Sequence, residues 1–224
     1  MTNRKITADD GFNSELVRGA TFDGIFEIPR INPPKSIIRP AGFTPFSKRK
    51  YAPTNCEAIC FFEMDTVFAD VLRNPYTYIE EFNSFSVFVP SDNSLYRDSP
   101  LAVQVANIYR SRAIGHFYQN HGANVYPLVR WGDERTYTTC TLPEKVAFVG
   151  IEHNCPVVVS SYGCIQGKEN KHHFRAGLEA MMNELEPSHV LVYGPMPEKV
   201  FAGVKGYSEF VQFPDWVSRV KGGE

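Results

Sequence analysis

The chain has 224 residues, of which 43% are hydrophobic and 21% charged, and its formal net charge is −2. This composition is that of a globular protein long enough to bury one large core. No apolar run approaches the roughly 20 residues that span a bilayer, and the first fifteen residues lack the apolar core of a secretory signal. We therefore expect a cytoplasmic protein without a membrane segment.

The charges are divided unevenly along the chain. Residues 1–50 carry 9 Lys and Arg against 5 Asp and Glu, whereas residues 51–224 carry 14 against 20. A basic leading segment could touch phosphate, but there is no basic stripe of the kind that dominates nonspecific DNA binding. The five cysteines are odd in number and form no CxxC pair. This pattern indicates reduced thiols and argues against a disulfide framework or a zinc ribbon.

The first fifty residues are rich in proline and glycine, which disfavours long helices. Within them, the segment 24–31 is predicted to form one short edge strand. We expect residues 1–50 to be an irregular extension that packs on a single α/β domain formed by residues 51–224.

From Cys56 onward, short apolar runs alternate with helical patterns. Strands are predicted at Ala58–Glu63, Ser86–Val89, Val125–Val129, Val146–Ile151, Pro156–Ser161, His189–Gly194 and Phe210–Phe213. Helices are predicted to start at Asp65 or Thr66, at Asn74–Pro75, at Ser99–Pro100, near Asn170 and around Trp216. The third of these helices should run to about Asn120 and be buried on most sides, so Asn107 and Arg112 would need internal partners.

This β-α alternation predicts an α/β fold with a mostly parallel sheet and right-handed crossovers. Residues 51–224 are too few for a full eight-stranded barrel of roughly 250 residues. An open sheet is the first expectation, and a reduced or incomplete barrel is the second.

Ligands gather at the carboxyl ends of parallel strands, and polar residues follow several of the predicted strands. Asp65 and Asp92 are the candidate catalytic residues, as an acid and base pair or as ligands of a divalent cation that contacts substrate phosphate. Alternatively, Asp65 only caps its helix and Asp92 only holds the tight turn of Pro90–Ser94. The candidate ligand-binding residues are Ser94, Tyr96, Arg130, Trp131, Ser160, Tyr162, Lys168 and Tyr193.

Arg130 and Trp131 suit a stacked or phosphate-bearing ligand, because a guanidinium offers fork-shaped donors and an indole a flat face. The loop Tyr162–Asn170 resembles a phosphate-binding loop only loosely, since Glu169 follows Lys168 where the ATPase pattern requires Ser or Thr. ATP hydrolysis by this loop is excluded, but anion binding at the following helix remains open.

A further cluster contains three histidines and two cysteines. Its members are His153, Cys155, Cys164, His172 and His173. Their separations fit no standard metal-ligand pattern, so we predict no metal site, and packing or solvation explains them better. A Cys-His nucleophile from this set is weaker still, since nothing in the sequence orients the histidine.

Several motifs together carry a family resemblance. They are ICFFEMD, NPYTYIEEF, PSDNSLYRDSPLAVQVANIYRSRAIGHFYQNHGANVYPLVRW, VSSYG and SHVLVYGP. From about Gly24 to Tyr193 the chain resembles the phage- and plasmid-borne domain of unknown function family 4417. That family commonly reads PDFSLY before a DMP helix start; this chain reads SDNSLY and RDSP and lacks the proline before Asp92. The resemblance implies a prophage or mobile-element protein, and it supplies no catalytic residues.

The residues leave two functions open. The first is an enzyme that acts on a nucleotide or nucleic acid through Asp65, Asp92 and Arg130. The alternative is a non-catalytic accessory protein of a phage or plasmid that binds a host protein and inhibits a defence complex. A module that binds a small ligand in the same cleft is a third possibility.

Overall fold

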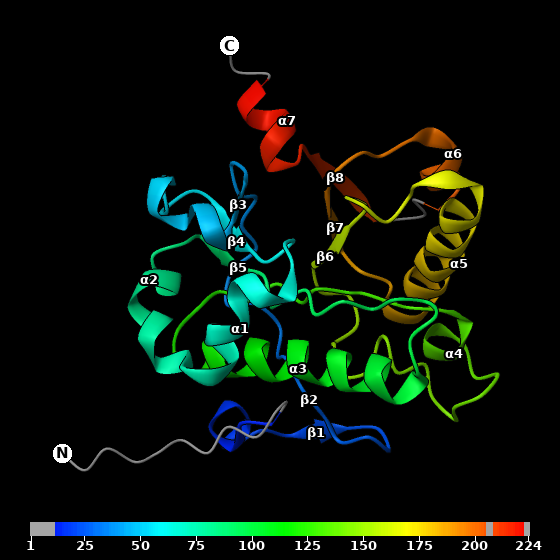
Figure 1. Cartoon of the computed structure of the whole chain (residues 1–224), viewed down its shortest axis with the longest axis horizontal. Coiled ribbons are helices and arrows are strands. Elements are labelled where there is room, and N and C mark those ends of the chain that lie inside the picture. The colour runs from blue at the N-terminus through cyan, green and yellow to red at the C-terminus, as the bar shows by residue number, and fades with distance from the viewer. Residues whose placement is uncertain (1–11, 205–207, 222–224) are drawn as a thin grey trace.

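Two parallel sheets form the centre of the computed structural model, which describes residues 12–204 and 208–221 (Figure 1). The first sheet has the order β3 (Phe43–Pro45), β4 (Ala58–Cys60) and β5 (Val87–Phe88), and the second has the order β6 (Val157–Ser160), β7 (His189–Tyr193) and β8 (Glu209–Phe213). Helices alternate with the strands. The mixed α/β class and the parallel pairing predicted from the sequence are therefore confirmed.

The helices are α1 (Asp65–Arg73), α2 (Ile79–Asn83), α3 (Leu101–Asn120), α4 (Glu134–Tyr137), α5 (Gly167–Leu185), α6 (Glu198–Phe201) and α7 (Trp216–Lys221), with 3-10 helices η1 (Ser14–Val17), η2 (Phe46–Tyr51) and η3 (Pro75–Tyr78). Capping residues and apolar spacing predicted α1, η3 with α2, α3, α5 and α7, whereas α4, α6, η1 and η2 were not predicted. α5 begins three residues earlier than expected. α3 ends at the predicted residue, and Gly122 follows it with φ 111°.

The predicted strand Val125–Val129 joins the two sheets, although it is present only as isolated bridges. Val125 pairs with Phe88 of β5, and Leu128 pairs with Val158 of β6, both in parallel. Backbone hydrogen bonds of 2.9 Å run from Tyr126 N–H to the Phe88 carbonyl and from Val129 N–H to the Val158 carbonyl. The carboxyl ends of the strands in both sheets consequently face one side of the molecule.

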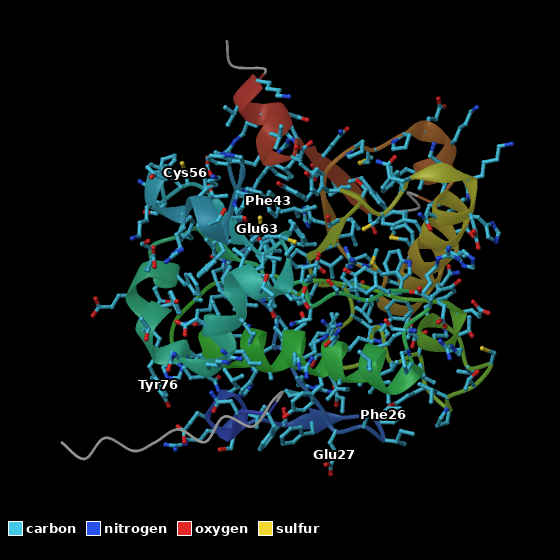
Figure 2. All side chains as sticks on the ribbon, in the orientation of Figure 1. Phe26, Glu27, Phe43, Cys56, Glu63 and Tyr76 are labelled. Atoms are coloured by element: carbon cyan, nitrogen blue, oxygen red, sulfur yellow. The ribbon has the colours of Figure 1, made fainter. Side chains whose placement is uncertain are left out.

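The sheets curve around a shared core. Alternate residues from both sheets point into one cluster, which includes Phe43, Cys60, Tyr126, Leu191 and Phe213. The rings of Phe43 in β3 and Phe213 in β8 lie 4.9 Å apart, and Phe43 is seen in Figure 2 among the side chains near β8. No hydrogen-bonded pairing joins β3 to β8 in the described residues, so the barrel is incomplete.

The N-terminal segment packs along α3 rather than extending the main sheets. β1 (Phe22–Asp23) and β2 (Ile28–Pro29) form a small antiparallel hairpin where one edge strand was expected, and Figure 1 shows this hairpin beside α3. The side chain of Gln119 in α3 accepts from Asn32 N–H at 2.8 Å and donates to the Asn32 carbonyl at 2.9 Å. The chain enters the first sheet at β3, before residue 50.

The strand predicted at Val146–Ile151 is wrong. These residues form turns, with a single bridge between Ile151 and Ile31, and Gly150 has φ 79°. The buried guanidinium of Arg112 explains the difference. It donates to the carbonyls of Ala147 at 2.9 Å, Val149 at 3.2 Å and Leu128 at 2.8 Å, so this apolar run is satisfied by a side chain instead of a neighbouring strand.

Within residues 12–204 and 208–221, no helix has the length and apolar character needed to cross a membrane.

Candidate functional site

The loop after β5 is fixed at the strand ends by Asp65. This first residue of α1 accepts hydrogen bonds from Ser94 N–H at 3.2 Å and from the Ser94 hydroxyl at 2.8 Å. The Ser94 carbonyl in turn accepts from the Asn107 side chain of α3 at 2.6 Å, which is one of the internal partners expected for that residue. Asp65 and Ser94 therefore hold the loop that carries Asp92 between two helices.

Asp92 and Arg130 form a largely buried ion pair. Arg130 Nε lies 3.2 Å from Asp92 Oδ1, and the two side chains are 20% and 11% exposed. Burial raises the pKa of Asp92 to about 6; Arg130 opposes this shift and Asp65 adds to it. Burial lowers the pKa of Arg130, but Asp92 and Cys164 outweigh it and raise that pKa. Asp92 is thus a carboxyl group whose pKa lies above its ordinary range.

The stability of Asp92→Asn relative to wild type is expected to increase as pH rises. The pKa of Asp92 is raised in the folded protein from 3.8 to about 6, so its stability contribution is complete below 3.8 and is lost as pH rises through 6. Asp92→Asn keeps the neutral form at every pH. Its excess free energy of unfolding over the wild type should grow by about 2 kcal/mol between roughly pH 4.5 and 7.5, measured by urea denaturation.

The exposed carboxylate of Asp98 provides the control for this stability experiment. Asp98→Asn removes one negative charge from the same loop without removing a buried carboxylate. A stability difference between Asp92→Asn and the wild type that stays constant over the pH range would contradict the assignment.

An open pocket of about 600 Å³ lies beside this ion pair at the strand ends. Its walls come from the loop after β5, the segment after Leu128, the end of β6 and the amino end of α5. The lining residues include Tyr96, Arg97, Arg130, Trp131, Ser160, Gly163, Cys164, Glu169, Asn170 and His173. Arg130 lines this pocket and also a small cavity of about 10 Å³ that contains Asp92.

Two polar atoms of the pocket have no hydrogen-bond partner in the described residues, the Ser160 hydroxyl and Nδ1 of His173. Ser160 ends β6 and is 1% exposed, on the same strand face as the inward-pointing Val158. Buried hydroxyl groups normally have a partner, and leaving one without a partner costs about 1–3 kcal/mol. The Ser160 hydroxyl therefore has an unused hydrogen-bond donor at the wall of the pocket.

Trp131 forms a wall of the pocket and is mainly a packing residue. It is 9% exposed, and its ring lies 5.3 Å from that of Phe174. A Cβ at Gly177 in α5 would collide with the indole, so only glycine lets α5 approach this ring. The indole keeps only a narrow accessible edge for the ligand stacking suggested by the sequence.

The pocket brings together four of the residues predicted from the sequence, namely Tyr96, Arg130, Trp131 and Ser160. Asp92 contacts Arg130 from the small cavity outside the pocket. Asp65 and Ser94 hold the loop after β5 in place. The other three candidates do not line it. Tyr193 is buried, its ring stacks on that of Phe62 with 4.6 Å between the ring centroids, and its hydroxyl accepts from Trp216 N–H. The ring of Tyr162 packs edge-on against that of Tyr193. Lys168 is exposed on α5.

The structure adds Cys164, Asn170 and His173, which the sequence did not place in a ligand site. Arg130 Nη1 donates to Cys164 Sγ at 3.2 Å. Asn170 and His173 lie three residues apart on α5 and so face the same side. This spacing of three residues was the sequence signal that could have placed Asn170 and His173 in one site. No group of three or more metal-ligating side chains gathers within residues 12–204 and 208–221.

These features define an α/β protein with an open pocket at the carboxyl ends of its parallel strands. The chain belongs to the family described as Domain of unknown function (DUF4417), whose model matches residues 20–214. The family resemblance noted in the sequence is therefore confirmed.

Two phage proteins are similar to this chain. The Gene 1 protein of Mycobacterium phage D29 is 31% identical over 172 residues, which are 75% of this chain and 60% of that protein. The Gene 1 protein of Mycobacterium phage L5 is 29% identical over 174 residues, 76% of this chain and 72% of that protein. The chain thus spans about three fifths of the D29 protein. No solved structure matches.

Proposed function

We propose that this phage-associated protein is an enzyme that acts on a nucleotide or nucleic acid in the pocket at the strand ends. The observation that carries the proposal is the buried Asp92–Arg130 pair, whose guanidinium lines the pocket. Perturbed carboxyl groups paired with a specific partner at a cleft are typical of functional sites. The pocket volume of about 600 Å³ is within the range of sites that bind ligands of nucleotide size.

In this proposal the residues have separate roles. Arg130 contacts a phosphate group of the substrate, because a guanidinium binds phosphate oxygens through two donors. Asp92 does not line the pocket and acts as a positioning residue, holding Arg130 while ionised and releasing it when protonated. Tyr96 is exposed at the rim and offers a flat face to a base. A divalent cation would enter with the substrate phosphate.

The activity is tested with a panel of ribo- and deoxynucleotides and of DNA and RNA strands, each with Mg²⁺ or with a chelator. We expect one substrate class to be converted, and Arg130→Gln to lower kcat/KM about a hundredfold through loss of the phosphate contact. Arg97→Gln, which removes a partly exposed guanidinium that is paired with Glu169 in the same pocket, is the control and should change kcat/KM much less.

The pH dependence of KM tests the role of Asp92. The ionised carboxylate competes with phosphate for Arg130, so KM should fall as pH drops through about 6. Asp92→Asn should remove this dependence. A dependence of the same size in Asp92→Asn and in wild type would contradict this role of Asp92.

The alternative function is inhibition of a host defence complex by binding, and for it we expect the opposite result with the same panel of substrates. It expects no conversion and no binding across the nucleotide and nucleic-acid panel. It also expects a stoichiometric host protein to be retained by wild type and by Arg130→Gln alike.

A further inference from the structure

We propose that the pocket binds the terminal phosphate of a single nucleotide between Arg130, Ser160 and the amino end of α5, and that it does not bind a nucleic-acid strand. This inference rests on the proposed function and narrows its substrate class. Three independent features belong to the walls of this one pocket, namely a cation, an unpartnered buried hydroxyl and the first turn of a long helix.

The first turn of α5 lines the pocket through Glu169 and Asn170. Gln166, which precedes this 19-residue helix, makes no side-chain cap, so the first backbone N–H groups are not satisfied by a capping side chain. Gly163 and Gly167 have φ of 73° and 76°, and no atom lies within 4 Å of a Cβ built at either position. A long helix with such an end attracts an anion through its N–H groups and its dipole.

Ser160 points to a ligand independently of the helix. Its hydroxyl is buried and has no hydrogen-bond partner in the described residues, and Ser160 lines the same pocket as Arg130. Ser161, the next residue, differs because its hydroxyl donates to the Pro195 carbonyl at 2.6 Å. A phosphate oxygen in the pocket would accept from Ser160, from Arg130 and from backbone N–H groups of α5 together.

The charges near the mouth favour one phosphate over many. Arg97 is paired with Glu169 at 3.0 Å, and Asp98 adds a further carboxylate to the lining. Residues 51–224 as a whole carry 14 Lys and Arg against 20 Asp and Glu. Single strands require a positively charged groove that follows several phosphates, and the pocket mouth offers none. A ligand with its charge concentrated at one end fits these surroundings better.

Calorimetric titration at low ionic strength tests this subsite on the full chain. The probes are inorganic phosphate, each of the four deoxynucleoside 5′-monophosphates, the four nucleosides, and a ten-nucleotide strand without a terminal phosphate. We expect phosphate and at least one monophosphate to bind, the nucleosides to bind at least tenfold more weakly than that monophosphate, and the strand to bind more weakly than it.

Two serine variants make a matched pair. Ser160→Ala should weaken binding of the monophosphate about tenfold, because it removes one hydrogen bond to a charged oxygen and no bond within the protein. Ser111→Ala also removes a buried hydroxyl without a partner, but Ser111 lines the small cavity outside the pocket and should leave binding unchanged.

The possible results separate this inference from the proposed function. Equal binding by Ser160→Ala and wild type, or no binding of any monophosphate, overturns the subsite. A strand that binds as tightly as the monophosphate overturns the restriction to single nucleotides and leaves the enzyme proposal intact. Binding that depends on Ser160 without conversion of any substrate supports the subsite and contradicts the enzyme.

Discussion

Arg112→Met is expected to lower the free energy of unfolding by about 3 kcal/mol. The Arg112 guanidinium is buried and donates to the carbonyls of Leu128, Ala147 and Val149. Burial lowers the pKa of Arg112 to about 9, which still leaves it charged at neutral pH. Methionine retains much of the apolar stem but leaves two buried carbonyls and one partly buried carbonyl without this donor. This loss outweighs the relief of a buried charge.

The measurement is urea denaturation of wild type and variant, with the slope against urea compared as well as the midpoint. Arg73→Met is the control, since Arg73 is exposed at the end of α1 and its loss should change stability by less than about 0.5 kcal/mol. A loss below about 1 kcal/mol for Arg112→Met would mean that the carbonyls find other donors and that the 146–151 turns do not depend on this side chain.

Arg219→Met is expected to cost about 3–5 kcal/mol, because it leaves a buried carboxylate without its cation. Glu57 is 6% exposed and precedes β4, and Arg219 of α7 approaches it with Nη1–Oε1 and Nη2–Oε2 distances of 2.8 and 3.2 Å. Thr44 also donates to Glu57. This pair attaches α7 near the start of β3, on the side where β3 and β8 remain unpaired.

A double variant separates the effect of the unpaired Glu57 charge from the effect of losing the Arg219 side-chain contact. Arg219→Met with Glu57→Gln should recover part of the lost stability, because the buried group is then neutral. Arg18→Met breaks the exposed pair with Glu15 and should cost less than about 1 kcal/mol. If the double variant is as unstable as Arg219→Met alone, packing of α7 and not the buried charge holds this side of the core.

The elements that the sequence predicted well are those with local signals. α3 is bounded by Pro100 and Gly122, and α5 carries apolar residues at helical spacing, so short-range periodicity and capping were sufficient. The strands β6 and β7 are short apolar runs between polar segments. The run Val146–Ile151 looks the same in sequence. The distant Arg112 donates to two of its carbonyls, and this contact leaves no local pattern that distinguishes the run from a strand.

The pocket shows the same division. The sequence by itself determined that polar residues follow the strands. It thereby selected Asp92, Arg130 and Ser160, although 38 residues separate the first two and 30 the last two. The tertiary structure alone decided which of them meet. Curvature of the sheets brings Arg130 against Asp92 and Cys164 and turns Tyr193 into the core, because side-chain direction and burial depend on packing between distant elements and leave no local pattern.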